Sequence, residues 1–277
     1  MNLLSEIVSS KQRRVDQAKK LVSLEQMRAM AIQARLGSRP HAFANALDDA
    51  NKINIIAEFK RRSPSKGEIR RDADPVSTAR AYESAGAAAV SVLTEEDYFG
   101  GSLDDLRAAR KAISLPILRK DFVFDEYQVY ESAAAGADAV LLIVAALDGE
   151  ALGRLRRLTE DELGMDALVE VHTAEEMKRA AASGAKLIGV NNRDLQTFTV
   201  SLETSVQLAP IAPKGSVLIS ESGIESAGDI RRLRSVGYRA FLIGESLMRA
   251  DDPGEVLGSL TQRRKGAKEV GASEWSE

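Results

Sequence analysis

Residues 134–144 read AAGADAVLLIV, a glycine-containing turn that passes directly into an unbroken apolar strand. Three other segments repeat this pattern: SAGAAAVSVLT at 84–94, ASGAKLIGVNN at 182–192 and SVGYRAFLIGES at 235–246. In each, a glycine stands where a preceding helix should end, because glycine adopts positive φ without steric cost. The four glycines are Gly86, Gly136, Gly184 and Gly237. Their spacing of roughly 50 residues indicates a repeated supersecondary unit.

A second apolar segment precedes each member of this set, and each has the length of one β-strand. These segments are INIIAEFK at 53–60, LPILRKDF at 115–122, DALVEVHT at 166–173 and SVLISESG at 216–223. Together the two sets predict eight strands. Helix start signals fall between strands, since an N-cap side chain or a proline at the first helical position marks a helix N-terminus. The signals are Asp74-Pro75, Ser102 with Asp105, Thr173 with Glu176, and Ser226 with Asp229.

Eight alternations of strand and helix, with nearly continuous apolar strands, indicate a parallel sheet covered by helices. The number of units favours a closed barrel of about 250 residues over an open sheet. The first strand is not followed by G-x-G-x-x-G, which weakens a dinucleotide-binding alternative. The sequence therefore predicts an α/β fold of the (β/α)8 TIM barrel type at 51–262. We expect an N-terminal helical extension at 1–50 that packs on the barrel, and a polar, flexible tail at 263–277.

The composition narrows the functional classes. A net charge of −3 and a pI near 5.7 argue against nucleic-acid binding. The chain has no cysteine and only two histidines, His41 and His172, so neither a disulfide nor a zinc site is expected. The amino-terminal residues lack the long uncharged segment of a signal peptide, and no apolar run of about 18 residues predicts a membrane span. We therefore expect a cytoplasmic protein without a bound metal or membrane partner.

Charged residues stand at the carboxyl ends of several predicted strands, where barrels of this type carry their active sites. Side chains alternate along a strand, so Glu58 and Lys60 share a face with Ile56. The other polar residues at such ends are Lys120, Glu170, Asn191, Glu221 and Ser222. Burying charges is costly unless they are paired or used, so this set predicts a polar pocket at one barrel mouth. Taken singly, Glu58–Lys60 also fits a structural ion pair, and Lys120 a solvated loop residue.

The last two strands are each followed by a glycine, and barrels commonly bind phosphate at these loops and at a short extra helix. Gly223 and Gly244 would let backbone N–H groups approach an anion, and ESLMRA at 245–250 predicts the short helix. Ser63 is placed to add a hydroxyl from the first loop. The predicted ligand is a phosphorylated small molecule, and the positive charges of Lys60, Lys120 and Arg193 favour additional negative charge on it.

Six ordered motifs resemble the indole-3-glycerol phosphate synthase family: IIAEFKRRSPSKG, LRKDF, LVEVHT, GVNNRDL, ISESGI and LIGESLM. The resemblance runs from the N-terminal helices to about residue 260. It implies a (β/α)8 barrel with an extra N-terminal segment. It also implies conversion of 1-(2-carboxyphenylamino)-1-deoxyribulose 5-phosphate to indole-3-glycerol phosphate in tryptophan biosynthesis, with release of CO2 and water. No metal or organic cofactor takes part in the family's reaction.

The same resemblance implies catalytic roles. Lys120 resembles the general acid that protonates the C2′ carbonyl oxygen, and Lys60 the residue that holds the substrate carboxylate. Glu170 is the expected proton-transfer group in the loss of water. The division of proton delivery between the two lysines stays open. Glu58 and Asn191 resemble residues that position the substrate and the lysines. Glu221 and Ser222 resemble residues that line the substrate hydroxyls.

The resemblance also implies a binding set. Its phosphate site corresponds to Ser63, Gly223, Gly244 and the backbone of Glu245. Many relatives have serine where Glu245 stands, so here only its N–H is expected to contact phosphate. The expected walls for the anthranilate ring are Phe122 and Leu195, with Arg193 at the rim.

Two alternatives to ring closure remain at this stage. One is another phosphate-binding barrel enzyme such as a phosphoribosylanthranilate isomerase, although the cysteine often used there as a base is absent. The other is a catalytically silent barrel that acts as a binding subunit, against which the full set of catalytic residue types argues. We expect a monomer, and leave higher assembly open.

Overall fold

The computed structural model describes residues 3–194 and 197–261 of the chain. Two predictions therefore lie outside the described residues: the tail at 263–277 and the side chain of Leu195. Among the described residues, no helix is long and apolar enough to cross a membrane.

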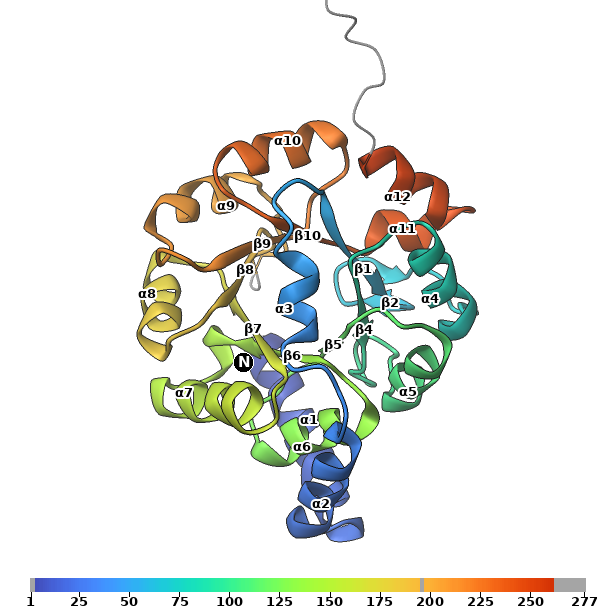
Figure 1. The fold of residues 1–277 in the computed structure, drawn as a ribbon, viewed down its shortest axis with the longest axis vertical. Coiled ribbons are helices and arrows are strands. Elements are labelled where there is room, and N and C mark those ends of the chain that lie inside the picture. Colours follow the sequence, from blue (N-terminus) through green and yellow to red (C-terminus); the bar gives the residue numbers. More distant parts are fainter. Residues whose placement is uncertain (1–2, 195–196, 262–277) are drawn as a thin grey trace, which may run out of the picture.

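Eight parallel strands form a closed barrel, as the sequence predicts (Figure 1). Each strand pairs with its neighbours in chain order, and β1 closes the ring by pairing with both β4 and β10. The strands are β1 (Asn54–Phe59), β4 (Ala89–Leu93), β5 (Ile117–Lys120), β6 (Ala139–Ile143), β7 (Asp166–Val171), β8 (Leu187–Asn191), β9 (Val217–Glu221) and β10 (Ala240–Ile243). A two-stranded ribbon, β2 (Arg62–Ser63) and β3 (Gly67–Glu68), follows β1.

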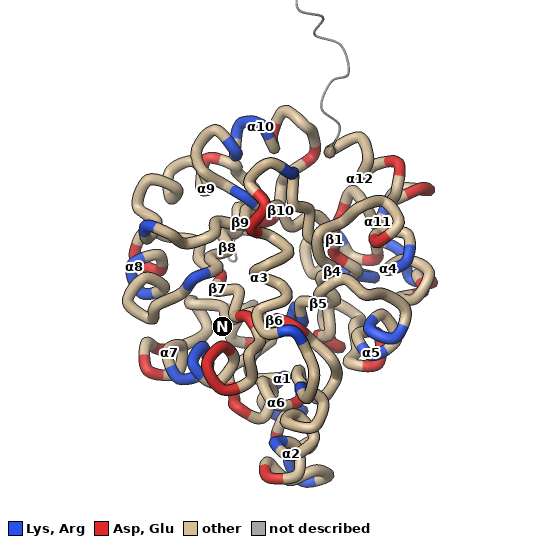
Figure 2. The backbone as a smooth tube through the Cα atoms, in the orientation of Figure 1, with Lys and Arg blue, Asp and Glu red and all other residues tan. Residues whose placement is uncertain are grey.

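Helices surround the barrel, and the positions of basic and acidic residues are intermixed along the backbone of this outer ring (Figure 2). All four predicted cap residues accept a hydrogen bond from the backbone N–H three positions on: Asp74, Ser102, Thr173 and Ser226. The outer helices are α4 (Pro75–Ser84), α5 (Leu103–Ala112), α6 (Glu126–Ala135), α7 (Gly149–Arg157), α8 (Ala174–Ser183), α9 (Glu203–Leu208), α10 (Ala227–Ser235), α11 (Glu245–Arg249) and α12 (Pro253–Thr261).

The alternation of side chains along each strand produces two separate apolar cores. Ile55 and Phe59 point outward and pack with residues of the surrounding helices. Ile56 points inward and packs with Leu118 and Leu168 in the barrel interior. Glu58 has the same parity as Ile56, so it also belongs to the interior face. The predicted assignment of faces on the first strand is thereby confirmed.

The residues before the barrel form three helices, α1 (Leu3–Leu21), α2 (Leu24–Arg35) and α3 (Ala42–Leu47). Helix α3 lies over the barrel centre in Figure 1, at the amino-terminal mouth. Its Phe43 and Leu47 are fully buried in the interior core, and Asp166 accepts a hydrogen bond of 2.9 Å from the backbone of Ala44. Helix α2 packs along α6. The first turns of α1 reach the opposite mouth, so the segment contacts both ends of the barrel.

Candidate active site

A cavity of about 600 Å³ lies at the carboxyl ends of the barrel strands. Every predicted site residue that the structure describes lines it. The acid, base and amide groups are Glu58, Lys60, Lys120, Glu170, Asn191 and Glu221. The predicted binding residues are Ser63, Phe122, Arg193, Ser222, Gly223, Gly244 and Glu245. Parallel strands bring these residues together because all their carboxyl ends meet at one rim.

Lys120 is the last residue of β5, and its ammonium lies between the carboxyl groups of two glutamates on other strands. Its Nζ is 3.1 Å from Oε2 of Glu170 on β7 and 3.2 Å from Oε2 of Glu221 on β9. The lysine side chain is 14% exposed and both glutamates are nearly fully buried. The alternative of a solvated loop lysine is therefore wrong.

This geometry moves the three pKa values in different directions. Burial alone would lower the pKa of Lys120, but Glu170, Glu221 and Glu58 outweigh it and raise the pKa above its ordinary value. Burial likewise favours a neutral Glu170, but the positive charge of Lys120 lowers its pKa. Glu221 differs, because burial and the repulsion from Glu170 raise its pKa to about 8 despite Lys120. The site thus holds an ammonium acid, an ionised carboxylate and a second carboxyl that carries a proton at neutral pH.

Glu58 and Lys60 form an ion pair in the wall of the cavity. Lys60 follows β1 and reaches back, so that its Nζ lies 2.6 Å from Oε1 of Glu58. Gly244, on the neighbouring strand's end, makes room for this carboxylate. A Cβ at Gly244 would lie 2.4 Å from Glu58 Oε1, so a larger residue there would displace the pair. Glu58 and Lys60 therefore form an ion pair and also line the pocket, so the two interpretations of these residues are compatible.

Asn191 ends β8 and organises the loops beside Glu170. Its Oδ1 accepts hydrogen bonds from Ser222 Oγ at 2.9 Å and from the backbone of Arg193 at 3.0 Å. Ser222 has a φ of 69°, a left-handed conformation that is strained for a non-glycine residue. Such strain is maintained only where surrounding contacts enforce it, and it collects at functional sites. The Ser222 hydroxyl is thereby held at the cavity wall.

The predicted phosphate end is formed by the loops after β9 and β10. Gly223 has a φ of +76°, and a Cβ there would lie 2.4 Å from Cγ1 of Val200. Glu245 begins α11, so its backbone N–H faces the end of β10. Ser246, in the next position, also lines the cavity, and among the described residues its buried hydroxyl has no hydrogen-bond partner. Ser246 was not predicted as a site residue, although its place in the first turn of the predicted short helix could have indicated it.

The side chain of Glu245 lies among three cations at the cavity rim. Its carboxylate is 3.3 Å from Nε of Arg249, 3.6 Å from Nζ of Lys66 and 3.9 Å from an Nη of Arg193. The basic residues that would attract an anionic ligand are therefore gathered around a resident carboxylate. Lys66 and Arg249 were not predicted as site residues, because nothing in their local sequence distinguishes them from other surface cations.

An apolar wall faces the acid–base groups. Phe122, predicted as a ring contact, lies beside Phe99, with the ring centroids 6.2 Å apart. Leu4 and Ile7 of α1 also line the cavity. Phe99, Leu4 and Ile7 were not predicted, because an amphipathic helix and a loop aromatic carry no local sign of which distant surface they cover.

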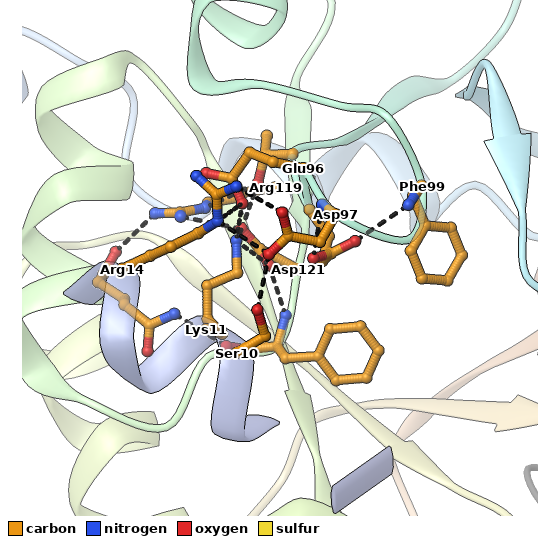
Figure 3. Close-up of polar contacts among 12 residues, drawn as sticks. Ser10, Lys11, Arg14, Glu96, Asp97, Phe99, Arg119 and Asp121 are labelled. Carbon is orange, nitrogen blue, oxygen red and sulfur yellow. Dashed lines mark hydrogen bonds and ion pairs between the residues drawn. The ribbon is translucent and has the colours of Figure 1, made fainter. Parts of the chain in front are cut away.

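A buried charge network fixes α1 to this side of the barrel (Figure 3). Lys11 donates to Glu96 Oε2 at 2.6 Å and to Asp121 at 3.1 Å. Asp121 also accepts from Arg119 at 3.0 Å and from Thr94 Oγ1 at 2.6 Å. Asp121 is adjacent to Lys120 in the chain. The network therefore connects the helix that covers the cavity with the strand end that carries the central lysine.

The arrangement can donate and accept protons next to a bound anion. It has two ammonium groups, the carboxylates of Glu58 and Glu170, and a protonated carboxyl within one enclosed space. General acid–base catalysis requires this proximity together with pKa values that keep each group in its working state. Among residues 3–194 and 197–261, no group of three or more histidine or acidic residues is placed to hold a metal ion.

Comparison with known proteins identifies the family. Residues 4–260 match the family model described as indole-3-glycerol phosphate synthase. An indole-3-glycerol phosphate synthase of Carboxydothermus hydrogenoformans is 48% identical over 261 residues, covering 93% of this chain and 98% of the relative. One of Syntrophobacter fumaroxidans is 50% identical over 262 residues, covering 94% and 97%.

Solved structures agree on the fold. A thiamine phosphate pyrophosphorylase from Pyrococcus furiosus superposes with a TM-score of 0.57, covering 76% of this chain and 95% of the other. At 16% identity this likeness concerns the fold alone. With the family match over nearly the whole chain, the conclusion is that this protein belongs to the indole-3-glycerol phosphate synthase family.

Proposed function

We propose that this chain is a carboxy-lyase that converts 1-(2-carboxyphenylamino)-1-deoxyribulose 5-phosphate to indole-3-glycerol phosphate in tryptophan biosynthesis. Family membership supports the reaction and its phosphorylated substrate. The observation that carries the residue assignment is the ammonium of Lys120 held between Glu170 and Glu221 inside the cavity. The reaction needs a proton donor and a proton acceptor in one enclosed site.

Lys120 is the general acid of ring closure. The new bond joins the ring carbon that bears the carboxylate to the C2′ carbonyl carbon, and the carbonyl oxygen takes a proton from Lys120. The ionised Glu170 beside it stabilises the charged form of the lysine, so Lys120 carries its proton before each turnover. A positioned acid of this kind typically contributes about 10²–10⁴-fold to the rate.

Lys60 and Glu170 serve the two following steps. Lys60 holds the substrate carboxylate until it leaves as CO2, and the electron pair of the broken bond restores the aromatic ring. Water is then lost: Lys60 protonates the departing hydroxyl and Glu170 takes the proton from C1′. The Glu58–Lys60 distance of 2.6 Å supports this role, because the pair keeps the ammonium directed into the cavity.

The phosphate rests against the loops after β9 and β10. The loops that carry Gly223 and Gly244 line this end of the cavity, and the N–H of Glu245 is the expected donor there. Ser63 and the unpartnered hydroxyl of Ser246 are further donors at this end of the cavity. The apolar wall at Phe122 then faces the anthranilate ring.

The test is formation of indole-3-glycerol phosphate, followed by its fluorescence, with wild-type protein and Lys120→Ala. Removing the acid should abolish turnover, while far-UV circular dichroism stays unchanged. Lys178→Ala is the matched control, because this lysine is 73% exposed on the outer helix α8. Unimpaired turnover by Lys120→Ala would remove Lys120 from the mechanism, and wild-type protein that makes no product would overturn the proposed function itself.

A further inference from the structure

We infer that His172, held by Glu176, is a positioning residue that keeps the carboxylate of Glu170 ionised and oriented toward the substrate. The inference rests on the proposed function for the role of Glu170 as proton acceptor. His172 belongs to neither the predicted site nor the lining of the main cavity. It is one of only two histidines in the chain.

The two oxygens of Glu170 face different nitrogen-bearing side chains. Oε2 lies 3.1 Å from Nζ of Lys120, and Oε1 lies 3.4 Å from Nε2 of His172. Glu170 and His172 are two residues apart at the end of β7, so their side chains share a face of the strand. The carboxylate is therefore flanked by nitrogen on both sides. Its plane is determined by these two contacts together with Asn191.

Glu176 fixes the other side of the histidine ring. Its Oε2 accepts the backbone N–H of His172 at 2.6 Å and lies 3.2 Å from the ring Nδ1. Glu176 is in the first turn of α8, where the Thr173 cap sets the backbone. With Nδ1–H donated to Glu176, Nε2 can present a hydrogen to Glu170 only when the ring is an imidazolium. Within the described residues Nε2 is buried and makes no hydrogen bond, so its 3.4 Å approach to Oε1 of Glu170 is a charge–charge contact.

The surrounding charges favour the imidazolium. Burial lowers the pKa of His172, but Glu176, Glu170 and Glu221 outweigh burial and raise it above the ordinary value. On the far side of the ring lies a second cavity of about 550 Å³, and its charged lining residues besides Glu176 are Arg193 and Asp194. Of these two, Arg193 opposes the imidazolium and Asp194 favours it.

The consequence is a specific pH dependence. Lys120 and His172 both lower the pKa of Glu170. Loss of the imidazolium removes one of these two cations, so the pKa of Glu170 rises. The acid limb of the kcat profile reports the base in the enzyme–substrate complex, and it should move to higher pH in His172→Gln. A charge-retaining His172→Lys should keep the limb close to the wild-type position.

Two measurements test the inference. In kcat against pH, His172→Gln should lower kcat about tenfold with a smaller change in KM, and should shift the acid limb upward by about one unit. His172→Lys should recover most of kcat. His41→Gln is the matched control, because His41 contacts Asp166 at the opposite mouth of the barrel. A His172→Gln profile that overlays the wild type, or a His172→Lys variant with the same loss and an unmoved limb, would overturn the inference.

The second measurement needs no turnover. The two histidine C2 protons can be titrated by NMR and assigned with His172→Gln. Glu170→Gln removes a negative charge 3.4 Å from Nε2 and should lower the pKa of His172, whereas the His41 titration should not move. An unmoved His172 titration contradicts the coupling even in an active enzyme. If the His172 titration shifts in Glu170→Gln but the wild-type protein has no synthase activity, the contact between the two residues is supported and the proposed function is contradicted.

Discussion

At the residue scale, the site depends on carboxylates with similar chemistry but different environments. Glu170 and Glu221 both contact Lys120, yet burial and mutual repulsion keep one ionised and the other protonated. A glycine on the neighbouring strand leaves space for the carboxyl group of Glu221. A Cβ at Gly189 would lie 2.1 Å from Oε1 of Glu221. Glycine at this position on β8 is therefore a requirement of the neighbouring glutamate rather than of the strand backbone.

The raised pKa of Glu221, about 8, predicts a cost to stability at alkaline pH. Between the pKa of the unfolded chain and that of the folded protein, the folded state holds the proton more tightly. Its stability therefore falls as pH rises through this range. Glu221→Gln removes the effect, so the variant's stability relative to wild type should increase from about pH 5 to about pH 8. Urea unfolding at both pH values measures it, with the exposed Glu150→Gln as control. A difference that is constant with pH would show that folding does not raise the pKa of Glu221.

Glu245 predicts an effect on substrate affinity. Its carboxylate lies among Lys66, Arg193 and Arg249 at the expected phosphate end. The negative charge of Glu245 therefore repels the phosphate, and Glu245 pairs with the cations that would otherwise bind the phosphate. Glu245→Ser should lower KM by roughly two- to fivefold with little change in kcat, as for a partly exposed charge. The effect should shrink at high salt. Steady-state kinetics beside the exposed control Glu255→Ser measures it. A raised KM would mean that Glu245 assembles the cations for the ligand instead of competing with it.

At the element scale, the N-terminal helices are parts of the site rather than an appendage. Helix α3 closes the interior core at one mouth, while α1 contributes Leu4 and Ile7 to the wall of the cavity at the other. Lys11 ties α1 to the loop after β4 and to the end of β5. The position of this helix and the shape of the apolar wall are therefore coupled through one buried ammonium.

Lys11→Met tests this coupling. The substitution leaves Glu96 and Asp121 without their shared ammonium, although Arg119 still holds Asp121. The expected loss in the free energy of unfolding is about 1–3 kcal/mol, as for a buried charged group that loses one partner. KM should rise as well, because the wall formed by α1 is loosened. Urea unfolding and kinetics should be compared with Lys20→Met, an exposed lysine of the same helix. Equal stability of the two variants would show that the network does not hold α1.

At the scale of the whole molecule, the barrel could be predicted because its signals are local and repeated. Glycine turns, apolar strands and N-caps each depend on a few adjacent residues, and the eight-strand ring follows from their number. The rim residues could be predicted for the same reason, since Glu58 and Lys120 each stand at the carboxyl end of a predicted strand. Contacts that depend on long-range packing could not be predicted from the sequence. The cation cluster around Glu245, the Lys11 network and the His172–Glu170 contact join segments whose meeting only the folded chain determines.

Closure of the ring has a consequence for synthesis of the chain. The first strand completes its pairing only with the last, in a register that places Asn54 beside Ala240. At ribosomal rates of about 5–20 residues per second, roughly 10–40 s separate the emergence of these partners. Throughout that interval one edge of the apolar strand β1 has backbone N–H and C=O groups without hydrogen-bond partners. Such an edge can pair with strands of other incompletely synthesised chains. The nascent chain should therefore need chaperones until the last barrel strand, β10, has left the ribosomal exit tunnel.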